Sequence, residues 1–336
     1  MLDHIAFLSQ PTERVRSNKN DRYFRIRIAR DPDEHARNLT GWKQQYDQLS
    51  RGKFLGSLTE LWLDQTQIFK ETTSHAVRQS CEIRHNSIWF GIPSGRSDSF
   101  IGPNQITNNM IAVRQDGDEF KLLTPDSFEI LGIVIGKDVF AQHVYEIENI
   151  DLDPTLFAEN VLCLSPERRE RLSEFVLRVL EESQHNTILL CHAAARNALR
   201  EAIVGALVAA LGQRDNSSQH VSLNVNRYRI VTQIRDYIIA NRNQVITVPD
   251  LCRNFYISRR MLQYCFQEVV GMTPVAYLRA LRLNGARRDL RDVASHYATV
   301  QDIAATWGFW HLSQFARDYQ RLFGELPSAS LRTRMH

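Results

Sequence analysis

The sequence has 336 residues, of which 43% are hydrophobic and 24% are charged, and its formal net charge at pH 7 is +3. These values exclude a fibrous or low-complexity chain and are typical of a soluble globular protein with about two domains. The longest apolar run, residues 202–211, is about half of a membrane span. We therefore expect no membrane segment.

The cellular compartment of the protein can be predicted from its cysteines and from its first residues. The start lacks the basic segment and apolar run of a secretory signal. The five cysteines are scattered and show no CxxC spacing, which argues against a disulfide framework and against a zinc cluster. We expect a cytoplasmic protein without a metal site.

Charge is distributed unevenly along the chain. Residues 225–336 contain 16 arginines, no lysine and 8 acidic residues, a net charge of +8, which leaves −5 for residues 1–224. A basic segment beside a mildly acidic body is typical of a nucleic-acid-binding domain. A solvated arginine-rich surface would have the same composition, so charge alone does not decide between them.

The first half of the chain has a β texture. Residues 1–37 are polar without a sustained period, which predicts a mobile N-terminal arm. From residue 39 to about 139, short alternating stretches are separated by turn signals such as Asp116-Gly117. This pattern predicts an antiparallel β barrel or sandwich of the cupin-like kind, within an α+β protein.

One alternating stretch, residues 54–69, supplies candidates for an effector site. Leu61 and Leu63 fall on one face of a strand, and polar or aromatic side chains fall on the other. An ammonium group is bound by a carboxylate and an aromatic face. The candidates are Glu60, Trp62, Asp64 and Trp89. Tryptophans in the barrel core and solvated acids remain the alternative.

Helical periodicity replaces the β pattern after Ser165-Pro166, which predicts a helix cap, and a second helix is expected over residues 187–211. We interpret residues 38–211 as an effector-binding and dimerisation domain. Residues 212–224 are polar and predict a linker to a helical domain, residues 225–336.

The helical domain contains an internal repeat. TVPDLCRNFYISRRMLQYCFQEVVGMTP, residues 247–274, aligns with TVQDIAATWGFWHLSQFARDYQRLFGELP, residues 299–327. In the second copy Thr299 caps a short helix, Gly308 permits a tight turn, and a longer helix follows. Its predicted apolar stripe is Leu312, Phe315, Tyr319, Leu322 and Phe323. Each copy is a helix-turn-helix unit, over residues 247–271 and 299–324.

We expect the exposed faces of the two second helices to carry the side chains that read DNA, with an ordinary solvated surface as the alternative. Arginine can contact guanine through two hydrogen bonds and glutamine can do so with adenine. The base-reading candidates are Arg259, Arg260, Gln263, Tyr264, Ser313, Gln314 and Arg317. Candidates for phosphate contacts are Gln267, His311 and Arg321. Between the units, residues 273–292 predict a helix of about 27 Å, comparable with the ~34 Å that separates successive major grooves.

The tail, with a second unit reading WGFWHLSQFARDYQRLFGELP, resembles the AraC/XylS family of bacterial transcription regulators over residues 227–334. Alignment with that family implies base reading by Arg260, Gln263 and Tyr264 in the first unit. In the second unit it implies Ser313, Gln314 and Arg317. The sequence departs from the family pattern at Leu312, where some relatives have a polar contact residue.

The front half resembles the activators of ethanolamine-utilisation operons within that family, on residues 41–61, 77–93 and 123–135. This resemblance implies ethanolamine and adenosylcobalamin as co-inducers, with no cofactor required. It also implies double-stranded promoter DNA and RNA polymerase as partners of a homodimer. The alternative is a same-fold regulator of another pathway, such as quorum sensing or virulence, with a different effector or none.

An enzyme is the distant alternative, because β-barrel domains can hold catalytic metals. The 11 histidines form no HExxH pair, and the sequence has no P-loop, GxGxxG or GxSxG motif. We therefore expect a regulator and no enzymatic activity.

Overall fold

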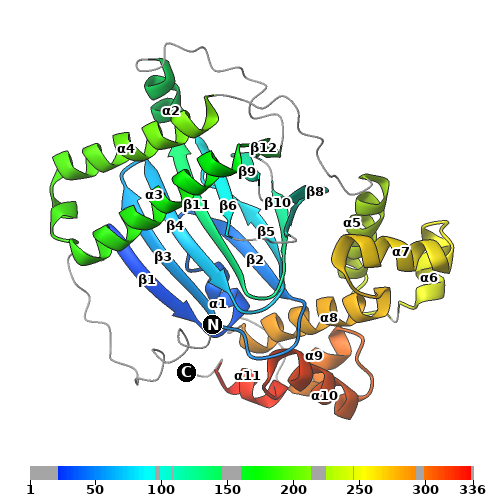
Figure 1. The fold of residues 1–336 in the computed structure, drawn as a ribbon. Coiled ribbons are helices and arrows are strands. Elements are labelled where there is room, and N and C mark those ends of the chain that lie inside the picture. Colours follow the sequence, from blue (N-terminus) through cyan, green and yellow to red (C-terminus); the bar gives the residue numbers. More distant parts are fainter. Residues whose placement is uncertain are drawn as a thin grey trace.

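The computed structural model describes residues 22–94, 99–107, 109–117, 119–145, 160–212, 225–244, 246–292 and 299–333. Figure 1 shows a β body with two long helices on one side and an all-helical part on another. The β body consists of two antiparallel sheets. The predicted α+β architecture, with antiparallel sheets followed by a helical domain, is confirmed.

All strand pairs of the described residues are antiparallel. The larger sheet contains, in spatial order, β1 (Phe24–Ala29), β3 (Gly56–Leu63), β4 (Thr66–Thr73), β11 (Phe128–Gly136), β6 (Ser87–Pro93), β9 (Met110–Gln115) and β12 (Val161–Cys163). The smaller sheet contains β2 (Lys43–Gln48), β5 (Val77–Glu82), β10 (Phe120–Thr124), β7 (Ser99–Ile101) and β8 (Asn104–Ile106).

The segment predicted to be a mobile arm, residues 1–37, contains ordered structure. Strand β1 pairs with β3, and the short helix α1 (Pro32–Ala36) follows it. The prediction is therefore wrong for residues 22–36, and residues 1–21 lie outside the described part of the chain. Alternating arginines in FRIRIA hid a strand that is stabilised by pairing with a distant neighbour.

Residues 54–69, expected to alternate as one stretch, fold instead as a hairpin of β3 and β4. Asp64 makes the turn with a positive φ of 57°, a conformation that aspartate tolerates better than most residues. The predicted alternation holds within β3, because Leu61 and Leu63 are buried in the core under the helices. Glu60 and Trp62 lie on the opposite face of the strand.

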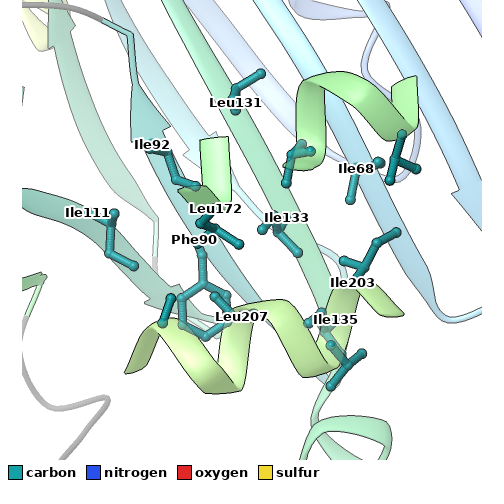
Figure 2. Close-up of a cluster of buried hydrophobic side chains, with 14 of the residues drawn as sticks. Ile68, Phe90, Ile92, Ile111, Leu131, Ile133, Ile135, Leu172, Ile203 and Leu207 are labelled. Atoms are coloured by element: carbon teal, nitrogen blue, oxygen red, sulfur yellow. The ribbon is translucent and has the colours of Figure 1, made fainter. Parts of the chain in front are cut away.

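Two long helices cover the larger sheet (Figure 1). Helix α3 (Pro166–His185) begins as predicted, with the Ser165 hydroxyl accepting a hydrogen bond from the backbone of Arg168. A 3-10 turn, η4 (Leu189–Cys191), leads to α4 (Ala193–Leu211), and the shorter α2 (Lys137–His143) follows β11. Figure 2 shows isoleucines of β11 meeting Leu172 of α3 and Leu207 of α4, all buried in one core.

The C-terminal domain is helical in its described residues, as predicted. Its helices are α5 (Val225–Ala240), α6 (Val248–Asn254), α7 (Arg259–Val270), α8 (Pro274–Arg291), α9 (Val300–Thr306), α10 (Leu312–Phe323) and α11 (Pro327–Thr333). Of the predicted linker, residues 213–224 lie outside the described part. Helix α8 connects the two units and has 18 residues. Its length therefore matches the prediction.

Helix α8 packs against the second unit through a glycine. An added Cβ on Gly285 would lie 2.1 Å from the Trp307 ring, so the close approach requires the absence of a side chain. The indole Nε1 of Trp307 donates to Asp289 of α8 at 2.7 Å. This contact fixes α9 against the connecting helix.

A buried arginine joins the C-terminal domain to the β body. Arg287 of α8 is 3% exposed, and its Nε lies 2.7 Å from the Asp31 carboxylate at the start of α1. Its Nη1 lies 3.0 Å from Glu325, and its guanidinium stacks 4.5 Å from the Phe323 ring. Arg291, one turn later, also pairs with Asp31 at 2.9 Å. One charge cluster therefore links α1, α8 and the end of α10.

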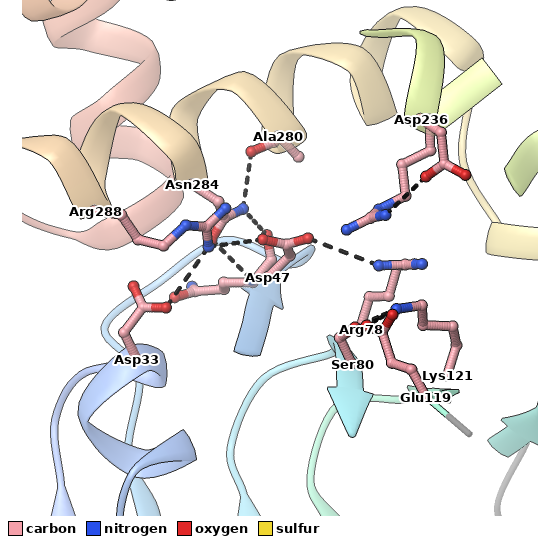
Figure 3. Close-up of polar contacts among 12 residues, drawn as sticks. Asp33, Asp47, Arg78, Ser80, Glu119, Lys121, Asp236, Ala280, Asn284 and Arg288 are labelled. Carbon is pink, nitrogen blue, oxygen red and sulfur yellow. Dashed lines mark hydrogen bonds and ion pairs between the residues drawn. The ribbon is translucent and has the colours of Figure 1, made fainter. Parts of the chain in front are cut away.

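Further polar contacts extend this interface. Figure 3 shows Asn284 and Arg288 of α8 facing Asp47 and Asp33 of the β body, and Arg288 pairs with both carboxylates. The Asn284 side chain accepts from the backbone N–H of Gln48 and donates to the Gln48 carbonyl, both at 2.9 Å. Gln48 Nε2 and the Gly52 N–H donate to the Leu322 carbonyl at 2.9 and 3.0 Å. The β body thus satisfies an unpaired carbonyl in the last turn of α10.

Two aspartates at the start of α1 have pKa values that are shifted in opposite directions in this interface. Burial opposes ionisation of Asp31, but the charges of Arg287 and Arg291 outweigh it, and the pKa of Asp31 is lowered. Burial raises the pKa of Asp33 from 3.8 to about 6, against the attraction of Arg288 and with the support of the negative charges on Asp31 and Asp47. Asp33 therefore binds a proton more tightly in the folded protein than in the unfolded chain.

Gly285→Ala should lower the free energy of unfolding by about 1–3 kcal/mol, because the new methyl group overlaps the Trp307 ring. The matched control is Gly205→Ala in α4, where the nearest atom would lie at 3.6 Å. Helix propensity predicts that this control raises stability by about 0.5–1 kcal/mol. Urea denaturation followed by circular dichroism measures both, and equal effects of the two substitutions would contradict the packing described.

The interface also predicts a pH dependence. Since the folded-state pKa of Asp33 is raised, the stabilisation from its protonation is complete below pH 4 and is lost as the pH rises to about 6. The unfolding free energy of the unmodified chain relative to Asp33→Asn should fall by about 2 kcal/mol between pH 4 and pH 7. Asp236→Asn, at an exposed acid, is the control. Parallel stability curves for Asp33→Asn and the unmodified chain would refute the assignment.

Candidate DNA-binding surface

The first helix-turn-helix unit consists of α6 and α7. Thr247 and Asp250 form a reciprocal capping box at the start of α6, and their hydrogen bonds lower the pKa of Asp250 to about 2. Ser258 caps α7 by accepting from the Met261 N–H at 3.1 Å. The helix ends at Gly271, which has a left-handed φ of 68°.

The second unit repeats this plan with α9 and α10. Thr299 caps α9 by accepting from the Asp302 N–H at 3.1 Å. The turn contains Gly308 with a φ of 75°, and α10 ends at Gly324 with a φ of 70°. At the start of α10, His311 stands where the first unit has Ser258, and its side chain makes no capping hydrogen bond.

The turn of the first unit is strained where the second unit has glycine. Tyr256 occupies the position equivalent to Gly308 and adopts a φ of 52°. A left-handed conformation costs a side-chain-bearing residue roughly 1–2 kcal/mol. The capped helices on both sides, starting at Thr247 and Ser258, hold the turn in this conformation.

Helices α7 and α10 each bury one face and expose the other. The buried face of α10 includes Phe315, Tyr319 and Phe323, as predicted. Leu312, predicted to be in this stripe, is 43% exposed because it is the first residue of the helix. The base-reading candidates are all exposed: Arg259, Arg260, Gln263, Tyr264, Ser313, Gln314 and Arg317. The phosphate candidates Gln267, His311 and Arg321 are exposed as well.

Within the second unit, two candidate side chains contact each other. Arg317 donates from Nη2 to Oε1 of Gln314 at 3.0 Å, one helical turn away. The amide thereby orients a guanidinium whose fork of donors matches the major-groove edge of guanine. The sequence analysis predicted that these two side chains lie on one face of α10, and the structure shows in addition that they form a hydrogen bond.

Two of the effector candidates lie inside the β body. The carboxylate of Glu60 accepts from the N–H and the hydroxyl of Thr40, at 3.1 and 2.9 Å, and from Gln67 at 2.6 Å. Trp89 is buried, with the ring of Trp42 at 5.7 Å in an edge contact, and Trp42 donates to Gln67. Glu60 thus belongs to a hydrogen-bonded cluster with Thr40, Gln67 and Trp42, and Trp89 packs against the Trp42 ring of that cluster.

The other two effector candidates lie elsewhere. Trp62 stacks against the guanidinium of Arg84 at 4.7 Å. Asp64 lies in the turn after β3 and lines a cleft of about 420 Å³ together with Asp138 and Glu201. The structure therefore does not bring the four candidates around one cavity, because the hairpin turn carries Asp64 away from the strand face.

In the part of the chain that the structure describes, no group of three or more histidine, cysteine, aspartate or glutamate side chains is placed to hold a metal ion. Nor does any described helix combine the length and apolar character needed to cross a membrane.

The sequence analysis missed the polar side chains that neighbour α7 and α10. Arg227 of α5 stacks on the Tyr264 ring of α7 with its guanidinium 4.3 Å from the ring centroid. Gln48 of the β body contacts the end of α10. The spacing of Arg227 before Thr247 equals that of Arg279 before Thr299, which is the one sequence signal that could have indicated a role for α5.

Known proteins resemble the helical part of the chain. A helix-turn-helix domain family matches residues 251–333. The probable thc operon regulatory protein of Rhodococcus erythropolis is 40% identical over 104 residues, which cover 31% of this chain and 31% of that protein. The chain thus spans about a third of the length of that relative.

A shorter relative is covered more completely. The XylDLEGF operon transcriptional activator 2 of Pseudomonas putida is 31% identical over 117 residues, 33% of this chain and 74% of that protein. A crystal structure of a probable AraC family transcriptional regulator from Rhodopseudomonas palustris CGA009 has 38% identity, covers 32% of this chain and 97% of that one, and gives a TM-score of 0.29. By its sequence matches and its repeated helix-turn-helix units, the chain belongs to the AraC/XylS family of transcription regulators.

Proposed function

We propose that the protein is a sequence-specific DNA-binding transcription regulator, acting as an activator, that inserts α7 and α10 into adjacent major grooves. The observation that carries the proposal is the repetition of one unit in which a capped helix and a left-handed turn present an exposed polar helix. Base edges in the major groove are read by side chains of this kind on this kind of helix.

Electrostatics support the same surface. Residues 225–336 have a net charge of +8, and this segment contains 16 arginines and no lysine. Arginine binds phosphate and guanine through two parallel hydrogen bonds, which lysine cannot do. The charge attracts the duplex and the exposed faces of the two helices discriminate its sequence.

The remaining assignments concern the β body. We propose that the protein acts in the cytoplasm as a homodimer, which forms through α3 and α4, whose outer faces are exposed. We also propose that the DNA-bound dimer contacts RNA polymerase. A single species at the monomer mass in analytical ultracentrifugation would exclude the homodimer. The resemblance of residues 41–61, 77–93 and 123–135 supports ethanolamine with adenosylcobalamin as the signal.

The full chain should select a defined duplex from a random-sequence library, and its affinity should fall steeply with salt as arginine–phosphate contacts exchange with counterions. Arg260→Ala and Arg317→Ala should each weaken binding to the selected duplex by about 1–3 kcal/mol and relax base preference at different positions. Fluorescence anisotropy at several salt concentrations and sequencing of the bound fraction measure these quantities.

The control for this experiment is Arg332→Ala, which removes an exposed positive charge on α11 without touching either reading helix. It should lower affinity slightly for all duplexes and leave base preference unchanged. Binding that does not depend on salt, or an unchanged preference after both Arg260→Ala and Arg317→Ala, would contradict the proposal.

Isothermal titration of the full chain should show heat on addition of ethanolamine in the presence of adenosylcobalamin, since an ammonium group requires carboxylate or aromatic partners in the β body. Asp64→Asn tests the one effector candidate that lines the cleft. Absence of heat would favour the alternative, a regulator of the same fold for another pathway with a different effector or none.

A further inference from the structure

The reading helices of the two units carry different charges at equivalent positions. When the units are aligned on Gly271 and Gly324, Tyr264 corresponds to Arg317 and Glu268 to Arg321. Helix α10 therefore carries two arginines on its exposed face where α7 carries a tyrosine and a carboxylate. Glu268 is the only acidic residue in the sequence of α7, and a carboxylate near a phosphate backbone opposes binding.

A neighbouring helix compensates for this difference. Arg227 of α5 forms an ion pair through its Nη1 with the Glu268 carboxylate. The same guanidinium lies 4.3 Å from the centroid of the Tyr264 ring. Tyr264 and Glu268 are four residues apart and lie on the same side of α7. One arginine thus contacts both positions that differ from α10.

In the second unit, the arginine that corresponds to Arg227 has a different partner. Arg279 of α8 is the counterpart of Arg227, at the same spacing before the helix cap, and lies 3.5 Å from the carboxylate of Asp318 in α10. The residue of α7 that corresponds to Asp318 is Cys265, which is buried and offers no carboxylate. In the first unit the arginine therefore pairs with Glu268 and stacks on Tyr264.

We propose that Arg227 is a specificity-determining positioning residue of the first DNA-reading surface. Its guanidinium fixes the ring of Tyr264 toward the groove and neutralises the Glu268 carboxylate, which would otherwise oppose the approach of the phosphate backbone. This inference rests on the proposed DNA-binding function and extends the first reading surface beyond its helix-turn-helix unit.

The physical basis is the freedom of an exposed tyrosine. Tyr264 is 53% exposed, so without a partner its ring can occupy several rotamers. A stacked guanidinium favours one of them through the cation–π attraction, and the pairing with Glu268 holds the guanidinium in place. A ring held in one orientation discriminates between bases better than a mobile one.

The experiment uses the full chain and a random-sequence duplex library. Tyr264→Ala and Arg317→Ala first assign the positions read by each unit. Arg227→Ala should then lower affinity for the selected duplex about fivefold and flatten base preference at the Tyr264-dependent positions, leaving the Arg317-dependent positions unchanged. Combined with Tyr264→Ala, it should produce no further loss of preference.

Three further variants separate the positioning role of Arg227 from the effect of its charge. Arg229→Ala removes an exposed arginine of the same helix and should leave base preference unchanged. Adding Glu268→Gln to Arg227→Ala should recover affinity without recovering preference. Arg227→Lys keeps the charge and the ion pair but lacks the flat guanidinium, so it should retain affinity and still flatten preference. It also provides the test if Arg227→Ala fails to fold.

An unchanged preference in Arg227→Ala or Arg227→Lys would overturn the inference while leaving the DNA-binding proposal intact. Equal effects of Arg227→Ala and Arg229→Ala would also overturn it. Failure of the unmodified chain to select any duplex would remove both proposals together.

Discussion

The buried guanidinium of Arg287 is the contact on which the arrangement of the two domains depends. It is enclosed by the carboxylates of Asp31 and Glu325 and by the Phe323 ring, which come from the β body and from the second helix-turn-helix unit. A buried charge that loses a partner costs several kcal/mol, so removing any one of these partners destabilises the closed interface. Because Arg287 belongs to α8, the helix between the two units, the β body is attached to the part that sets their spacing.

This attachment makes the two units unequal. The last turn of α10 receives hydrogen bonds from Gln48 and Gly52 of the β body, in addition to the charge cluster at Arg287. The first unit instead borders a small cavity of about 30 Å³, which is lined by Lys121 and Leu123 of β10, Val231 of α5, Val269 of α7 and Tyr277 of α8. A change within the β body would therefore act most directly on the second unit and on α8.

The reading surfaces differ as well, although their backbones repeat. Capping residues, left-handed turns and terminal glycines recur because each helix must satisfy its end groups and stop in the same way. The exposed faces are free of that requirement, so α10 carries its arginines in its own sequence and α7 receives Arg227 from α5. In the proposed function, repeating the unit with a different exposed surface would allow one chain to read two dissimilar sub-sites.

Local patterns in the sequence determined the helical domain almost completely. Caps at Thr247 and Thr299, the glycine at 308 and the apolar stripes depend on neighbours within a few residues. The two units, α8 and the exposed faces of α7 and α10 could therefore be predicted. The same reasoning gave the antiparallel sheets and α3. It assigned β1 to a mobile arm, because pairing with β3 is a distant interaction that FRIRIA alone does not indicate.

Tertiary structure alone decided which polar groups meet. The pairs Arg287–Asp31 and Asn284–Gln48 join residues more than two hundred positions apart, and no periodicity relates such positions. The effector candidates failed to converge for a related reason: a turn at Asp64 redirects the chain, and a turn depends on backbone conformation that composition does not show. Sequence determines helix faces through local geometry, whereas ion pairs, cavities and domain contacts depend on how distant segments come together in space.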